Sequence, residues 1–111
     1  MHYRVFYYFE RSGDTISSTN AVEMSARDIH RQLLGCLHGN DDYLGLIDAQ
    51  DNILQILCEP QLERFWVELP LEAAKASWGR YMKLDELVQL VETLPAIFDR
   101  ENLPELHYKP W

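Results

Sequence analysis

Two apolar segments joined by a short polar connection constrain the fold of this chain more than any other feature. Residues 43–48 read Tyr-Leu-Gly-Leu-Ile-Asp, and residues 53–58 read Ile-Leu-Gln-Ile-Leu-Cys. The connection at 49–52 reads Ala-Gln-Asp-Asn, which is polar and of hairpin length, and Asp and Asn readily adopt turn conformations. This spacing predicts an antiparallel hairpin, and the apolar character of both runs predicts that at least one strand lies well inside a sheet.

Residue type predicts two further strands outside this hairpin. Residues 2–10 are rich in Tyr, Phe and Val, which favours a strand that is covered on both faces. Residues 65–69 alternate, so that Trp66 and Glu68 share one face of the strand and the apolar residues share the other. The sequence therefore provides at least four candidate strands for one sheet.

Three segments carry weaker patterns. We expect residues 15–19 to form a short strand or an extended loop. Residues 71–83 mix helix-favouring and helix-breaking types, which predicts an irregular loop or one helical turn followed by a return toward the sheet. Residues 99–111 contain two prolines and are expected to form a tail.

Two amphipathic helices are predicted on either side of the strand-rich region. Ser25 and Asp28 have the spacing of a capping box, and apolar residues then recur at helical period as far as Gly39, which suits a helix C-terminus. A second apolar stripe covers residues 84–94 and stops before Pro95. Each helix thus has one apolar side available for packing against the sheet.

Together these segments predict a single α+β domain over residues 1–111. In the order strand, helix, strand, strand, strand, helix (βαβββα), they suggest a mostly antiparallel sheet of four to five strands with two helices packed on one face. Hydrophobic residues make up 47% of the chain, which is enough to fill one core without cross-links. Cys36 and Cys58 lie in apolar settings and are expected to be reduced, buried thiols.

The sequence contains no motif of a common enzyme class or cofactor site. Glycine-rich phosphate loops, the GxSxG elbow and the HExxH zinc motif are absent, and no Cys or His cluster has the spacing of a metal site. His30 and His38 lie about two turns apart on one helix, too far to share a metal ion. We therefore expect a protein without catalytic residues, bound metal or cofactor.

The chain is acidic, with 18 Asp and Glu residues against 10 Lys and Arg residues and a net charge of −8. This charge argues against nucleic acid and anionic membrane surfaces as partners, because both attract clustered bases. Between Arg31 and Arg64 the chain has six acids and no Lys or Arg. We expect these acids to gather around the predicted hairpin as a negative face that attracts a cationic protein partner.

Aromatic residues beside these acids are expected to add contact area, because Trp and Tyr are common anchors at interfaces. The residues predicted to contact the partner are Asp41, Asp42, Tyr43, Asp48, Asp51, Glu59, Glu63, Trp66 and Trp78.

A small acidic α+β chain without catalytic motifs resembles the immunity proteins of bacterial contact-dependent and type VI toxin systems. The segments 43–55, 67–70 and 78–80 (YLGLIDAQDNILQ, VELP and WGR) are similar to parts of other small bacterial domains. Immunity proteins commonly occlude the active site of a toxin, and many such toxins are basic nucleases. The resemblance implies an inhibitor whose acids at 41–63 mimic phosphate or pair with Lys and Arg of a toxin.

Two other functions fit the sequence. One is a small enzyme or small-ligand-binding domain with a pocket between sheet and helices, using Asp48, His30 or a cysteine. The other is a structural or adaptor module that forms a homodimer through a sheet edge such as the first strand. Because no signal peptide and no apolar stretch of roughly 20 residues is visible, we expect a cytoplasmic location for any of these functions.

Overall fold

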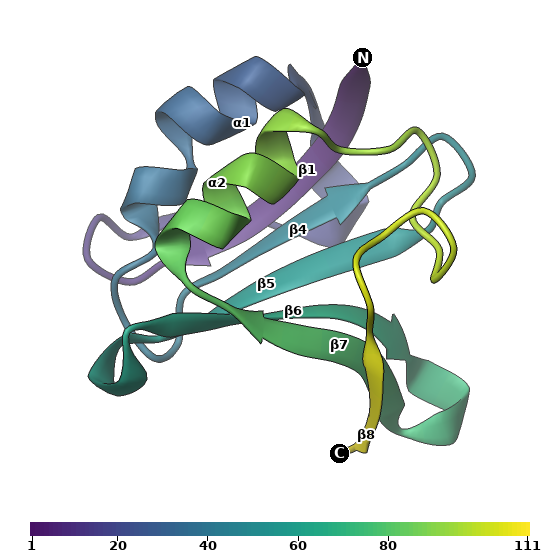
Figure 1. Ribbon diagram of the computed structural model, residues 1–111. Helices are drawn as coiled ribbons and strands as arrows, with labels where there is room; N and C mark the ends of the chain where they lie inside the picture. Colours follow the sequence, from purple (N-terminus) through teal and green to yellow (C-terminus); the bar gives the residue numbers. More distant parts are fainter.

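An antiparallel sheet of eight strands forms the body of the molecule, and two helices lie together on one side of it (Figure 1). The computed structural model describes residues 1–111. The sheet order is β2-β1-β4-β5-β6-β7-β8, and β3 pairs with β1 on the same side as β2. In chain order the strands and helices are β1 (His2–Phe9), β2 (Asp14–Ile16), β3 (Val22–Ser25), α1 (Ala26–Gln32), β4 (Tyr43–Ile47), β5 (Ile53–Glu59), β6 (Arg64–Leu71), β7 (Ala76–Met82), α2 (Leu84–Glu92) and β8 (His107–Pro110).

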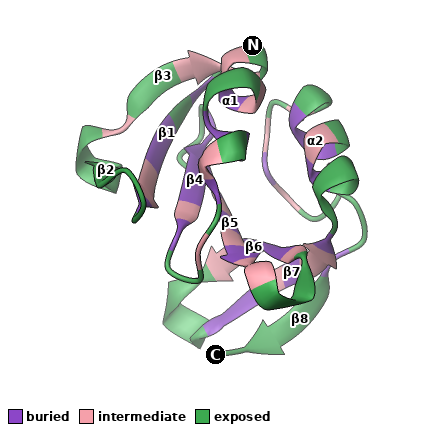
Figure 2. Ribbon diagram, turned by 90° about the vertical axis from the view of Figure 1, so that its left-hand side faces the viewer, coloured by how far each residue is buried: buried purple, intermediate pink, exposed green.

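The predicted architecture of four to five strands in the order βαβββα is wrong, because the sheet has eight strands. The additional strands are β2, β3, β7 and β8. Three of them are short edge strands of three or four residues with largely exposed side chains (Figure 2), so they carry no apolar alternation that a sequence could reveal. Pairing with β1 and β7 holds them in the sheet.

Strand β7 was not predicted from the sequence for a different reason. Its sequence, ASWGRYM, places Ser77 and Gly79 among the large residues and so lacks a clean alternation. The strand is held by seven paired positions with β6, from Phe65 opposite Met82 to Leu71 opposite Ala76. Long-range pairing therefore overrides weak local strand propensity in this segment.

The helices begin where the sequence indicates, but the first is shorter than expected. Ser25 Oγ accepts a hydrogen bond of 3.1 Å from the backbone N of Asp28, which satisfies a free donor of the first turn of α1. Helix α1 ends at Gln32, and a 3₁₀ turn at 34–36 replaces the predicted continuation. Neither helix has the length and apolar character needed to cross a membrane.

One apolar core fills the space between the helices and the sheet. Strands β1, β4, β5 and β6 each turn alternate residues into it, and the two helices and the 98–106 segment cover it from the other side. Its fully enclosed members, with 0% of their surface exposed, are Val5, Ile29, Leu44, Leu46, Leu54, Ile56, Leu87 and Val91. The opposite side of the sheet, which we call the helix-free face, carries the alternate side chains of each strand.

Candidate functional site

The helix-free face carries a continuous row of large side chains that runs across five strands. Tyr8 of β1 pairs with Tyr43 of β4, Tyr43 with Leu57 of β5, Leu57 with Trp66 of β6, and Trp66 with Tyr81 of β7. We call these five residues the cross-strand row. Four of them are half-buried and Trp66 is 8% exposed, although no helix lies over this face. The row is therefore an apolar, aromatic surface presented by a rigid sheet.

Glycines in the next row allow the aromatic rings to lie against the backbone. A Cβ atom at Gly79 would lie 2.5 Å from Cζ2 of Trp66 and 2.7 Å from the carbonyl oxygen of Val67. The ring of Phe6 occupies the corresponding space over Gly45. A larger residue at either position would lift the ring above it off the sheet, so both glycines are required by close approach.

Two basic side chains rest on the rings at the β6–β7 end of the row. The guanidinium carbon of Arg64 lies 3.6 Å from the centre of the Tyr81 ring. Lys109 Nζ lies 4.6 Å from the Trp66 ring and donates a 3.0 Å hydrogen bond to Tyr81 Oη. The rings of Trp66 and Tyr81 are 4.8 Å apart. This end of the row thus already attracts cations through the electron-rich ring faces.

A buried carboxylate lies beside Trp66. Glu68 is 7% exposed, and its Oε1 accepts hydrogen bonds of 2.7 Å from Trp66 Nε1 and from Ser77 Oγ. Ser77 Oγ in turn accepts a 2.7 Å bond from Nε1 of Trp111, whose backbone N also donates to the carbonyl oxygen of Lys75. These residues enclose a small pocket of about 310 Å³ on the helix-free face, between the row and the C-terminal strand.

Asp48, one of the predicted contact residues, is an internal structural acid. It is 1% exposed and accepts hydrogen bonds from the backbone N of Gln50, Asn52 and Phe98, and from the Asn52 side chain. Burial alone would raise the pKa of Asp48, but these hydrogen bonds outweigh it and hold the pKa below its ordinary value. Asp48 joins the β4–β5 hairpin to the loop at Phe98 and does not face a partner.

Asp42 has the same role at the opposite end of the sheet. It is 1% exposed and accepts hydrogen bonds of 2.8 to 2.9 Å from the backbone N of Glu10, His38 and Gly39. Burial again opposes ionisation, and the three hydrogen bonds prevail, so the pKa of Asp42 lies below its ordinary value. Its carboxylate anchors the start of β4 to the end of β1.

The remaining acids of the base-free stretch divide between the two ends of the hairpin. Asp41, Glu59 and Glu63 lie where β4 begins and β5 gives way to β6. Asp51 lies in the β4–β5 turn at the other end, where it forms an ion pair with Arg4. Arg64 pairs with Glu59 at 2.9 Å. The fold therefore supplies bases from outside the stretch, and the six acids do not form one continuous face.

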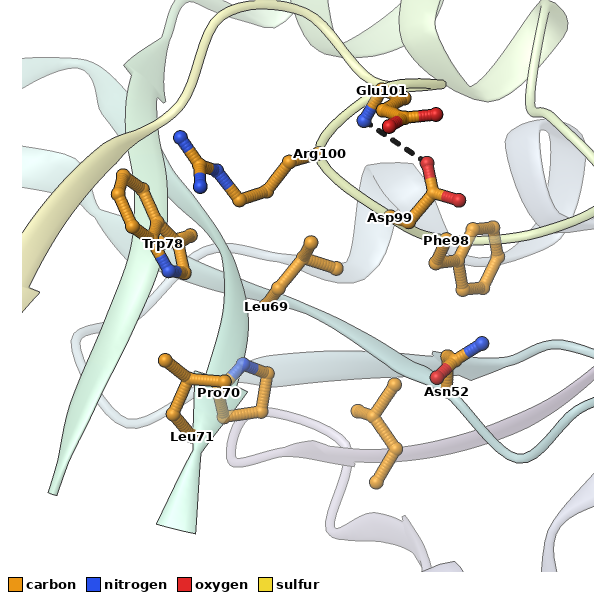
Figure 3. Close-up of a pocket in the computed structure, with 10 residues that line it drawn as sticks. Asn52, Leu69, Pro70, Leu71, Trp78, Phe98, Asp99, Arg100 and Glu101 are labelled. Carbon is orange, nitrogen blue, oxygen red and sulfur yellow. Dashed lines mark hydrogen bonds between the residues drawn. The ribbon is translucent and has the colours of Figure 1, made fainter. Parts of the chain in front are cut away.

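Trp78 lies on the other side of the sheet from Trp66, in an open cleft of about 800 Å³ (Figure 3). The guanidinium carbon of Arg100 is 3.5 Å from the centre of the Trp78 ring, and the edge of Tyr108 contacts it from another direction. Leu69, Pro70 and Leu71 line the apolar side of this cleft, and Figure 3 shows Asp99 and Glu101 at the opposite side. Trp78 is thus separated from the other predicted contact residues.

Of the nine predicted contact residues, Tyr43, Glu59 and Trp66 are brought together on the helix-free face, and Asp41 and Glu63 lie in the connections at the same end of the hairpin as Tyr43 and Glu59. Sequence reasoning missed Glu68, Ser77, Tyr81 and Lys109. A signal for Glu68 existed, because alternation in β6 places it on the same face as Trp66. No local pattern marks the other three, since their strands are assembled by long-range pairing.

The structure offers little for nucleophilic or metal chemistry. No group of three or more His, Cys, Asp or Glu side chains could hold a metal ion. Both cysteines are free thiols, and burial, aided by Asp42 and Glu59, raises the pKa of Cys58, which disfavours its reactive thiolate. No protein-family model matches the chain, and neither a curated protein nor a solved structure is significantly similar to it. Function must be inferred from the chain's own residues.

Proposed function

We propose that the protein is a non-enzymatic binding protein that neutralises a cationic protein partner by covering the partner's active site, as immunity proteins do. The cross-strand row carries this proposal. It is a surface of three Tyr, one Trp and one Leu, all but Trp66 partly exposed, on a sheet face that no helix covers. Aromatic residues are enriched at the centres of protein interfaces, where burial contributes most to affinity.

Acids along one side of the row support a basic partner. Glu10, Asp41, Glu59 and Glu63 all lie at the end of the sheet where β1 and β5 stop and β4 begins. The first three each lie two residues from a member of the row, and Glu63 lies three residues from Trp66. Carboxylates at the rim of an apolar surface steer and orient a cationic partner, while the net charge of −8 adds long-range attraction.

The proposed contact surface is the helix-free face, to which the hairpin contributes Tyr43 and Leu57 but not its 49–52 turn. Asp42 and Asp48 are not part of this surface, because their carboxylates accept hydrogen bonds from backbone groups inside the domain. The proposal retains the expected cytoplasmic location, with which two free thiols are compatible.

The test is complex formation with the product of the gene adjacent to this one, since toxins and their inhibitors are expected to be encoded together. We expect co-expression to suppress the toxicity of that product and calorimetry to show binding that weakens with salt. The double variant Tyr43→Ala/Leu57→Ala should weaken binding at least about tenfold. Leu84→Ala, an exposed apolar residue on α2, serves as the matched control and should bind normally.

Absence of binding at low salt would refute the proposal. Equal binding by the row variant and the control would place the contact elsewhere on the molecule. A stable dimer in sedimentation, lost in the row variant, would assign the row to self-association instead.

A second candidate function is small-ligand binding in the Trp78 cleft. Its volume of about 800 Å³ falls within the range of ligand pockets, and the Arg100 guanidinium there has no acid within ion-pair distance. Thermal-shift screening with small aryl carboxylates, with Arg100→Ala as the control, tests it. A rise in Tm that Arg100→Ala abolishes would support this function, and no rise would dismiss it.

A further inference from the structure

We propose that the pocket beside Glu68 receives a lysine or arginine side chain of the partner. This inference rests on the proposed function and adds the chemical group that the partner inserts. The pocket is lined by two acids, one base, two indole rings and three smaller side chains: Glu59, Glu68, Lys109, Trp66, Trp111, Leu57, Ser77 and Pro110.

Glu68 is a buried carboxylate with no cation in contact. It is 7% exposed, yet none of the five ion pairs of the structure includes it. Its two hydrogen-bond donors, the Trp66 indole and the Ser77 hydroxyl, are both neutral. The other buried acids, Asp42 and Asp48, also lack a cation, but both oxygens of each carboxylate accept hydrogen bonds. Glu68 differs from them because only one of its two oxygens is used, and a buried carboxylate is stabilised when its remaining oxygen gains a donor.

The free oxygen of Glu68 is the position that a cation would occupy. Both internal donors use Oε1, and Oε2 accepts no hydrogen bond from the protein. Every fully buried side-chain oxygen or nitrogen of the structure has a hydrogen-bond partner. Because Oε2 has none, this oxygen is not fully buried and is accessible from the pocket. A lysine ammonium or an arginine N–H can donate to this oxygen without displacing either existing bond.

The neighbouring rings favour the same kind of group. Lys109 Nζ rests 4.6 Å from the centre of the Trp66 ring, and Arg64 rests on Tyr81. Neither of these cations reaches Glu68, because Lys109 donates to Tyr81 and Arg64 pairs with Glu59. Of the two acids at the pocket, Glu59 is paired with Arg64 and only Glu68 has no cation within ion-pair distance, so Glu68 is the acid available to an incoming positive charge.

The size of the pocket suits one side chain. At about 310 Å³ it lies at the lower end of the ~300–1,000 Å³ range of ligand sites. A Lys or Arg stem can lie along Leu57 and Trp111 while its charged head reaches Glu68. Such an insertion would anchor the partner next to the cross-strand row, where Leu57 and Trp66 belong to both surfaces.

Titration with blocked amino acids tests this pocket directly. N-acetyl-L-arginine amide and N-acetyl-L-lysine amide are added to the ¹⁵N-labelled protein, and the indole N–H signal of Trp66 is followed. We expect saturable shifts with a Kd of the order of millimolar, as for a single inserted side chain. N-acetyl-L-citrulline amide, which is neutral and of similar shape, should bind at least about tenfold more weakly in the same titration.

Variants identify the responsible group. Glu68→Gln can still accept from Trp66 and Ser77 through its amide oxygen, and it should weaken arginine amide binding at least about tenfold. Glu72→Gln, an exposed acid in the β6–β7 connection, is the matched control and should bind normally. Lys109→Ala removes the ammonium that already lines the pocket, so it should strengthen binding of the arginine amide several-fold. This second variant tests the pocket even if Glu68→Gln fails to fold. Equal shifts with citrulline, no shift at all, or no effect of both Glu68→Gln and Lys109→Ala would overturn the proposal.

The two proposals fail in different ways. Normal binding of Glu68→Gln to the adjacent gene's product, together with loss of binding in the row variant, leaves the proposed function intact and removes the pocket from it. Binding of both amides without any binding of that product leaves a cation pocket and overturns the proposed function.

Discussion

The two faces of the sheet are built from the same strands but differ in what covers them. On the helix side, aliphatic residues at 0% exposure pack against α1, α2 and the 98–106 segment. On the helix-free face, rings lie across glycines and carry the side chains of Arg64 and Lys109, and no helix lies over them. Alternation along one strand thus assigns neighbouring residues to different surroundings: a closed core on one side and, on the other, the surface that we propose binds a partner.

The sharpest test of this comparison uses adjacent residues of β5. Ile56 faces the core at 0% exposure, and Leu57 belongs to the cross-strand row. Ile56→Ala should lower the free energy of unfolding by about 3 kcal/mol, through lost burial and a residual cavity. Leu57→Ala should lower it by less than about 1 kcal/mol. Urea denaturation measures both, and equal losses would show that the helix-free face is also a core.

Gly79→Ala tests whether the rings of the helix-free face are packed against the backbone. The new Cβ would meet the Trp66 ring and the carbonyl oxygen of Val67, so we expect a loss of about 1–3 kcal/mol in unfolding free energy. The tryptophan fluorescence of the folded protein should change as well. Gly35→Ala, where no atom lies within 4 Å of the added Cβ, provides the control and should change stability by less than about 0.5 kcal/mol.

Low pH should destabilise the protein through Asp42 and Asp48, which lie at the two ends of the sheet and on neither of its faces. The pKa values of Asp42 and Asp48 are lower in the folded protein than in the unfolded chain, so their contribution is complete at neutral pH. It should be lost as the pH falls below about 4, where these carboxyls take up protons more readily in the unfolded state. Urea midpoints at pH 7 and pH 3 measure the loss, and Asp48→Asn should show a smaller loss than the wild type. An unchanged pH dependence would contradict the assignment.

Lys109→Ala should have the smallest effect on stability. Its ammonium contacts the rings of Trp66 and Tyr81 at an exposed position, where such contacts contribute about 0.5–1 kcal/mol. Thermal unfolding should show a small decrease in Tm, and the signals of helix-side residues should stay in place in an NMR spectrum. Large changes among the helix-side residues would mean that the two faces are coupled.

Local chemistry was sufficient to predict part of this fold. The hairpin of residues 43–58, the start of α1 at Ser25 and the position of α2 follow from turn residues, capping and apolar period. The edge strand β2 overlaps the segment 15–19, expected as a short strand or an extended loop, whereas β3 and β8 were not predicted, because exposed short strands have no apolar face and depend on partners distant in the chain.

The candidate site was less accessible to sequence reasoning. Trp66 and Glu68 could be placed on one face from alternation alone, but the cross-strand row requires the register of five strands. Asp42 and Asp48 look like surface acids in a polar turn and loop. Their burial depends on donors that include Glu10 and Phe98, which lie 32 and 50 residues away.

The two connections of the β5–β6–β7 meander share one backbone shape. Each is a 3₁₀ turn followed by a residue in the left-handed region: Glu63 at φ 50° after residues 60–62, and Lys75 at φ 49° after residues 72–74. The same geometry therefore accommodates opposite charges at equivalent exposed positions. A charge change at either turn would therefore alter the surface at one end of the meander and leave the strand pairing that presents the row in place.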